Sequence, residues 1–115
     1  MPSKNLQRDY AAPAYYHVYN RGAGKQKIFL DSVDKRKFLS LLERHLIHPE
    51  EPTDGQQYPL YDIELIAYCL MGNHFHLLVY QDTDPLALTG LMKSVGTAYT
   101  MYFNKRHKSS GHLFQ

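Results

Sequence analysis

Two short apolar segments rich in β-branched and aromatic residues lie almost directly next to each other in the chain. They are Tyr61–Leu70 and His74–Tyr80, and only Met71-Gly72-Asn73 separates them. Glycine and asparagine tolerate positive φ angles, so this pair between two apolar segments is typical of a tight β-hairpin. The hairpin constrains the fold more than any other feature, because the remaining elements must pack around two fixed antiparallel strands.

The chain before the hairpin predicts a strand and a helix. Tyr15–Asn20 is aromatic and β-branched and stops at a Gly-rich segment that starts at Arg21, which is typical of a strand followed by a loop. Asp31 or Ser32 can cap a helix that ends at His48-Pro49. Its apolar residues recur at helical spacing: Phe38, Leu41, Leu42 and Leu46.

A second helix follows the hairpin. Asp84 provides an N-cap, Pro85 suits the first helical position, and an apolar stripe continues to about Asn104. The stripe consists of Leu88, Leu91, Met92, Val95, Tyr99 and Tyr102. Gly90 and Gly96 each cost this helix roughly 1 kcal/mol relative to alanine.

The resulting order is strand, helix, strand, strand, helix, with residues 111–115 opening a last strand. It predicts an α+β fold, a ferredoxin-like βαββαβ antiparallel sheet with both helices on one face and the end of the pattern missing. The chain of 115 residues is too short for two domains. We expect an N-terminal tail over 1–14, one domain over 15–115, and a surface loop at Glu50–Pro59.

Composition limits the cellular setting. The longest apolar run, Ile66–Met71, is far shorter than the roughly 18 residues that span a membrane, so no membrane association is expected. The N-terminus does not resemble a secretory signal, and the single Cys69 cannot close an intrachain disulfide. We therefore expect a cytoplasmic protein.

Cationic residues are concentrated in two places although the net charge is only +2. The stretch 105–112 carries basic residues and histidines and no acidic residue, and a second group flanks the glycines after the first strand. Cations interleaved with aromatic rings suit single-stranded nucleic acid. The candidate DNA-binding residues are Asn20, Arg21, Lys25, Lys105, Arg106 and Lys108. Solvated charges, and capping by the asparagine, are the alternative interpretation.

His74-Phe75-His76 is the strongest chemical motif. Alternate residues of a strand share a face, so both imidazoles project the same way from Cα atoms about 6.5 to 7 Å apart and can reach one metal ion. Phe75 then faces the helix-covered core and the histidines face the open side. Imidazole suits Zn, Mn, Fe or Ni, and with oxygen ligands also Mg or Mn. Two half-exposed polar residues are the alternative, and His17 is expected to be a packed sheet histidine.

Three segments in this order carry a family resemblance. They are Tyr16-His-Val-Tyr-Asn-Arg-Gly22, Cys69-Leu-Met-Gly-Asn-His-Phe-His-Leu-Leu-Val79 and residues 99–115. Together they closely resemble the IS200-like single-tyrosine transposases of the HUH type, especially those associated with repetitive extragenic palindromes. The resemblance covers residues 15–115.

The resemblance implies an enzyme of DNA transposition that cleaves and rejoins single-stranded or hairpin DNA. His74 and His76 would be the catalytic metal ligands for a divalent cation, Mg or Mn, and two protomers would form a homodimer. The family's nucleophilic tyrosine lies on a further helix beyond the region that resembles 111–115, so we expect this chain to lack it and to be inactive by itself. Tyr99 and Tyr102 are expected to be core residues.

Two other functions remain open. The first alternative is a non-catalytic module of the same fold that recognises structured DNA or RNA. The second is a metal-binding dimerisation domain without nucleic acid. Metal-dependent nicking separates the enzyme from the first alternative, and salt-sensitive oligonucleotide binding separates the two alternatives.

Overall fold

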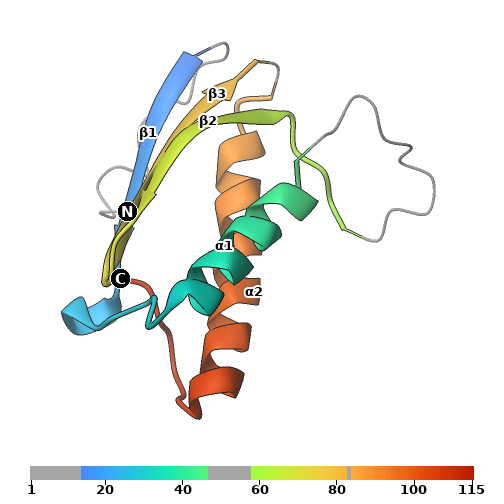
Figure 1. The fold of residues 1–115 in the computed structure, drawn as a ribbon. Helices are drawn as coiled ribbons and strands as arrows, with labels where there is room; N and C mark the ends of the chain where they lie inside the picture. The colour runs from blue at the N-terminus through green and yellow to red at the C-terminus, as the bar shows by residue number, and fades with distance from the viewer. Residues whose placement is uncertain (1–13, 47–57, 83) are drawn as a thin grey trace.

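Three extended segments form one antiparallel sheet with the strand order β1-β3-β2 (Figure 1). The strands are β1 (Ala14–Arg21), β2 (Ile63–Leu70) and β3 (His74–Gln81). The other elements are a short 3-10 turn, η2 (Ala23–Lys25), and the helices α1 (Ser32–Arg44) and α2 (Ala87–His107). The computed structural model describes residues 14–46, 58–82 and 84–115. The α+β class and the element order in this part of the chain agree with the sequence prediction.

The predicted hairpin is present, but its predicted backbone conformation is wrong. The amide of Met71 donates to the carbonyl of His74 at 2.9 Å and closes the turn between β2 and β3. Neither Gly72 nor Asn73 has a positive φ. Instead, the carbonyl of Gly72 accepts hydrogen bonds from two amides, those of Ile28 (2.8 Å) and Phe29 (3.1 Å). Tertiary contacts to the segment before α1 therefore hold this turn.

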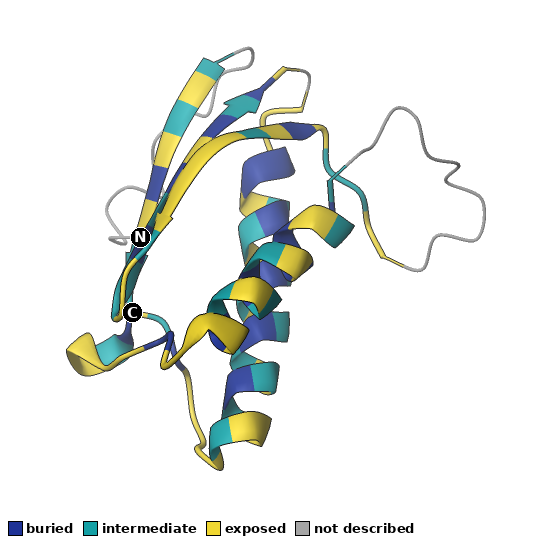
Figure 2. Cartoon of the chain, in the orientation of Figure 1, coloured by how far each residue is buried: buried dark blue, intermediate teal, exposed yellow. Residues whose placement is uncertain are grey.

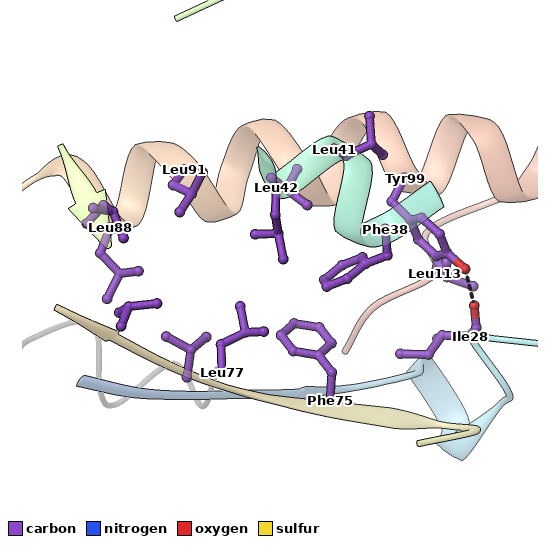
Figure 3. Packing of buried hydrophobic residues seen from close by; sticks show 14 of the residues in the cluster. Ile28, Phe38, Leu41, Leu42, Phe75, Leu77, Leu88, Leu91, Tyr99 and Leu113 are labelled. Carbon is purple, nitrogen blue, oxygen red and sulfur yellow. Dashed lines mark hydrogen bonds between the residues drawn. The ribbon is translucent and has the colours of Figure 1, made fainter. Parts of the chain in front are cut away.

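Both helices lie on one face of the sheet, and the central strand β3 divides its residues between the two faces (Figure 1). Phe75, Leu77 and Val79 are buried, and the side chains of Phe75 and Leu77 point toward the helices (Figure 3). His74 and His76 alternate with them along the strand and are only partly buried, and Leu78 is exposed. The predicted separation of apolar and imidazole side chains is thus confirmed. In the described part of the chain no helix covers the imidazole face.

The core joins the two helices to the sheet (Figures 2 and 3). Phe38 of α1 contacts the rings of Phe75 and Tyr99, with centroids 4.9 and 5.4 Å away. Aromatic contacts in these geometries add about 0.5 to 1.5 kcal/mol each to the burial term. The α2 residues that face the core are Leu88, Leu91, Val95, Tyr99 and Phe103.

Helix α1 begins as predicted and ends earlier. Asp31 is its N-cap, and the Asp31 carboxylate accepts from the amide of Asp34 at 3.1 Å. The helix ends at Arg44, whereas the predicted end, His48-Pro49, lies outside the described residues. The predicted tail over 1–14 and loop Glu50–Pro59 also lie outside them, except for Ala14, Tyr58 and Pro59.

Helix α2 starts slightly later than predicted and ends slightly later. Asp84 accepts from the amide of Leu86 at 2.9 Å, so Asp84 and Pro85 form a turn that precedes the helix. The buried Gln81 accepts from the amide of Leu88 at 3.0 Å and satisfies a second free donor at this end. The helix then continues to His107.

The last residues return to the end of β1. Phe114 forms an antiparallel bridge with Gly22, and the amide of Gln115 donates to the carbonyl of Arg21 at 2.8 Å. Residues 111–115 form this isolated bridge and no strand, so the predicted last strand is represented only by a single bridge to the end of β1. Among the described residues no helix is both long and apolar enough to cross a membrane.

Candidate metal centre and nucleic-acid interface

The imidazoles of His74 and His76 lie side by side on the open face of the sheet. Their ring centroids are 5.2 Å apart and the ring planes are perpendicular. Both residues are half-buried, because their strand β3 lies between β1 and β2. The arrangement follows from the two-residue repeat of a strand. Two imidazoles therefore lie next to each other on one solvent-accessible patch of the sheet.

His17 of β1 adds a third imidazole to this patch. Its Nε2 lies 2.9 Å from Nδ1 of His76, and the two rings stack with centroids 5.0 Å apart and planes 7° from parallel. A packed sheet histidine was expected at position 17; its ring does stack on His76, but the residue is exposed. Its hydrogen-bond distance to the motif was not predicted.

Asn73 holds the other imidazole. Its Oδ1 lies 2.8 Å from Nδ1 of His74, and its Nδ2 donates to the carbonyl of Lys25 at 3.4 Å. Asn73 was expected only to be a turn residue, and this contact was not predicted. Its position directly before the His-x-His motif is the one signal that could have indicated it.

Tyr19 completes the aromatic part of the patch. Its ring centroid lies 5.0 Å from that of His76 and 5.7 Å from that of His74. The ring is 39% exposed, and Tyr15, on the same face of β1, is 66% exposed. Exposed rings of this kind can stack with nucleic-acid bases, each contributing about 1 to 3 kcal/mol. The alternation along β1 placed Tyr19 on this face, but its proximity to the histidines needed the strand register.

The electrostatics favour neutral histidine. Burial lowers the pKa of His76, and the neighbouring charges of His17 and His74 lower it further. A neutral imidazole has a free lone pair, which is the form that binds a metal ion. Among the described residues no group of three or more His, Cys, Asp or Glu could hold a metal ion.

Arg21 is the predicted DNA-binding residue that lies closest in register to the histidines. It is the direct cross-strand partner of His74, so the two side chains share the open face. Its Nε donates to Oε1 of Gln115 at 2.8 Å, a bond exposed to solvent. A guanidinium can bind a phosphate through two parallel hydrogen bonds. Asn20 is paired with Phe75, whose side chain faces the core, and its Oδ1 accepts from the amide of Arg21.

Lys25 also lies near the motif. It is exposed in η2 with a φ of 63°, and its carbonyl accepts from Asn73. The turn between β1 and α1 thus approaches the turn before the histidines. A solvated lysine here adds positive charge to the same end of the sheet.

The cations at the end of α2 differ from one another. Lys105 and Lys108 are exposed, whereas Arg106 forms ion pairs with two carboxylates. Its Nη1 lies 2.8 Å from Asp31 and 2.7 Å from Asp34. Arg106 therefore links α2 to the start of α1, and although it is also exposed, its guanidinium is bound to carboxylates.

Asp34 is the centre of a buried polar cluster. Besides Arg106, it accepts hydrogen bonds from Tyr102 (2.6 Å) and the amide of Leu30 (3.0 Å), and His107 Nε2 lies 2.9 Å away. Burial raises the pKa of Asp34, but these donors outweigh it and hold the pKa below its ordinary value. Two residues of the cationic stretch 105–112, Arg106 and His107, are therefore bound to a carboxylate of the same chain.

Tyr99 and Tyr102 lie on the core side, as predicted. Tyr99 is fully buried and its hydroxyl donates to the carbonyl of Ile28 (Figure 3). Burial raises the pKa of both phenols, and the hydrogen bond to Asp34 raises that of Tyr102 further. The Tyr99 hydroxyl thus binds the segment before α1 and the Tyr102 hydroxyl binds α1 itself, on the helix side of the sheet.

The chain matches no family model, no curated protein and no solved structure.

Proposed function

We propose that the protein acts as the core of a metal-dependent enzyme that cleaves and rejoins single-stranded or hairpin DNA, in the manner of the HUH single-tyrosine transposases. The observation that carries the proposal is the composition of the open sheet face. Two imidazoles that can share a cation, an arginine directly opposite in register, and an exposed tyrosine ring lie together there. These are the groups that a phosphodiester and its neighbouring base would require.

The finer fold assignment belongs to the same proposal. A ferredoxin-like sheet has a fourth strand beside β1, and the contacts of Phe114 and Gln115 with the end of β1 support one. A homodimer is also proposed, since β2 is a sheet edge in the described residues and edge strands are commonly covered. A cytoplasmic location remains an expectation that rests on the single Cys69.

The chemistry follows from the positions of the side chains. His74 and His76 would hold Mg or Mn, which would polarise the scissile phosphate and stabilise charge on its oxygens. Arg21 is placed to donate to a phosphate oxygen once it leaves Gln115. Tyr19 is placed to stack on a base beside that phosphate. In these enzymes a tyrosine oxygen attacks the phosphorus and the 3′ oxygen leaves, and neither Tyr99 nor Tyr102 is placed for that attack.

The test is incubation of the full-length gene product with labelled hairpin oligonucleotides and Mn, followed by denaturing electrophoresis. We expect metal-dependent cleavage and a covalent protein–DNA band that His76→Ala and Arg21→Ala abolish. Tyr102→Phe should retain the band, because its hydroxyl serves Asp34. If only Tyr102→Phe lost the band, Tyr102 would be the nucleophile, which would contradict its assignment to the core.

The same experiment separates the alternatives. Tight, salt-sensitive binding of the hairpin without any cleavage, unchanged by Mn and by His76→Ala, would reject the enzyme and favour a structured-DNA or RNA-binding module. Absence of binding at low salt would reject both nucleic-acid functions.

A further inference from the structure

We propose that Asn73 and His17 are positioning residues that hold His74 and His76 in one tautomer, protonated at Nδ1 and with Nε2 unprotonated for a cation. Neither residue would touch the cation. The inference deepens the proposed function and rests on it for the identity of the ligand, whereas the tautomers themselves can be tested in the absence of DNA and metal.

The tautomer of His74 follows from the orientation of the Asn73 amide. Its Nδ2 donates to the carbonyl of Lys25, an atom that can only accept, and this bond determines which end of the amide faces His74. The end that faces His74 is Oδ1, 2.8 Å from Nδ1. An amide oxygen cannot donate, so Nδ1 of His74 carries the proton. In the neutral ring Nε2 is then left with a free lone pair.

The tautomer of His76 depends on the contact with His17. The bond joins Nδ1 of His76 to Nε2 of His17, and one of the two nitrogens must carry the proton. If His76 is the donor, its Nε2 is free in the same way as that of His74. His76 then matches its neighbour, and both histidines of the motif present equivalent nitrogens on the open face.

The bonds from Asn73 to His74 and from His17 to His76 thus have the same proposed effect, a proton on Nδ1 and a free Nε2. Metal-binding histidines usually donate their second ring N–H to a fixed acceptor, which sets the tautomer and the ring orientation. In the proposed tautomers the acceptors are a turn amide that the loop at Lys25 orients and an imidazole from the adjacent strand β1. The stacking of His17 on His76, with planes 7° from parallel, restricts rotation of the second ring as well.

The first measurement is the two-bond ¹H–¹⁵N imidazole spectrum of the metal-free full-length protein at a pH of about 8.5, where ordinary histidines are neutral. It distinguishes protonated from unprotonated ring nitrogens directly. We expect Nδ1–H and a bare Nε2 for both His74 and His76. The Nε2–H form as the main species at either residue would overturn the proposal for that residue.

The second measurement uses paired variants. His17→Phe keeps a ring but removes the acceptor, so it should move His76 to Nε2–H and weaken Mn binding about 10- to 100-fold. His17→Gln offers an amide oxygen and should preserve the Nδ1–H form and most of the affinity. For His74, Asn73→Ala removes the acceptor and should move the proton to Nε2, whereas Asn73→Asp keeps a carboxylate acceptor and should preserve the Nδ1–H form. His112→Ala, an exposed histidine of the last segment, is the control that should change neither quantity.

Each result has one meaning. Unchanged tautomers in His17→Phe and Asn73→Ala would reject the positioning role, and failure of the Gln and Asp variants to rescue would reject it as well. Should the Phe variant fail to fold, the wild-type spectrum and the Gln variant still decide the matter. If the protein has the expected tautomers and binds Mn but neither binds nor cleaves DNA, the proposed function is rejected. The positioning role would still hold in that case.

Discussion

The hydroxyl of Tyr102 donates a 2.6 Å hydrogen bond to Oδ1 of Asp34, and so joins the last turns of α2 to the first turn of α1. Arg106 and His107 reach the same carboxylate from the next turn. A carboxylate with no exposed surface is tolerated because these partners satisfy it. The cluster is thus a structural connection between two helices that the core alone would hold less specifically.

The first prediction concerns Asp34. Asp34→Ala should lower the free energy of unfolding by about 3 kcal/mol, because it leaves Arg106 without its buried partner and removes acceptors from Tyr102 and the amide of Leu30. Urea denaturation measures the change. Glu64→Ala, an exposed carboxylate of β2, is the control and should change stability by less than about 0.5 kcal/mol. Equal decreases in the free energy of unfolding for the two variants would show that the Asp34 cluster stabilises the fold no more than an exposed carboxylate does.

The second prediction is the response to acid. The pKa of Asp34 is lowered in the folded protein, so the carboxylate stabilises the fold above its unfolded pKa of about 3.9. That contribution is lost as the pH falls through the lowered folded value. Stability should therefore drop below about pH 4, and Asp34→Asn should flatten this part of the profile. Thermal melts from pH 2 to 7 test this, and parallel profiles for both proteins would contradict it.

The third prediction distinguishes the two glycines of α2. A Cβ on Gly90 would lie 2.5 Å from Cε1 of Tyr61, whereas a Cβ on Gly96 would have no neighbour within 4 Å. Gly96→Ala should therefore raise stability by up to about 1 kcal/mol through helix propensity. Gly90→Ala should lower it, since the Tyr61 ring must move and its hydroxyl contact with Ser94 is lost. Melting temperatures that shift the same way in both variants would refute this difference.

The fourth prediction concerns Mn binding at the imidazole face. Titration with Mn should broaden the imidazole signals of His74 and His76 first, and His74→Ala with His76→Ala should abolish the effect. Binding should be weak, because two nitrogens leave most positions to water. His112→Ala is the control. Broadening that persists in the double variant would place the cation elsewhere.

The fifth prediction separates the cations of α2. Lys105→Ala with Lys108→Ala should lower the log–log salt slope of hairpin DNA binding by up to about 2, nearly one for each lost phosphate contact. Arg106→Gln should leave that slope unchanged and lower stability instead, because Arg106 is bound to Asp31 and Asp34. A slope that falls in Arg106→Gln alone would show that the ion pairs open when DNA binds.

Periodicity predicted the elements because it reflects which face of each is buried. The pattern of Phe75, Leu77 and Val79 correctly placed both histidines on the opposite face of the sheet. The sequence could not supply the register between β1 and β3, and that register brings Arg21 opposite His74 and Tyr19 opposite His76. Contacts between residues far apart in the chain are set by tertiary packing.

Two features have partners that the sequence did not indicate, for the same physical reason. Gly72 and Asn73 were selected as a turn because both tolerate positive φ angles, whereas neither has one and the Gly72 carbonyl is bound by the amides of Ile28 and Phe29. Arg106 was predicted as a DNA contact, and in the structure it forms ion pairs with Asp31 and Asp34. In both cases the partner lies far away in the chain, where local sequence patterns cannot reveal it.

The imidazole pair lies on the middle strand of the sheet, which is hydrogen-bonded along both sides. Amide hydrogens of such a strand exchange with solvent only when the whole unit opens, whereas sheet margins exchange through small local openings. The spacing between the two rings should therefore persist for as long as the protein stays folded. The bonds between Arg21 and Gln115 lie at the end of β1, where small local openings are sufficient to break them. The two imidazoles should therefore keep their spacing through local openings that release the Arg21 guanidinium.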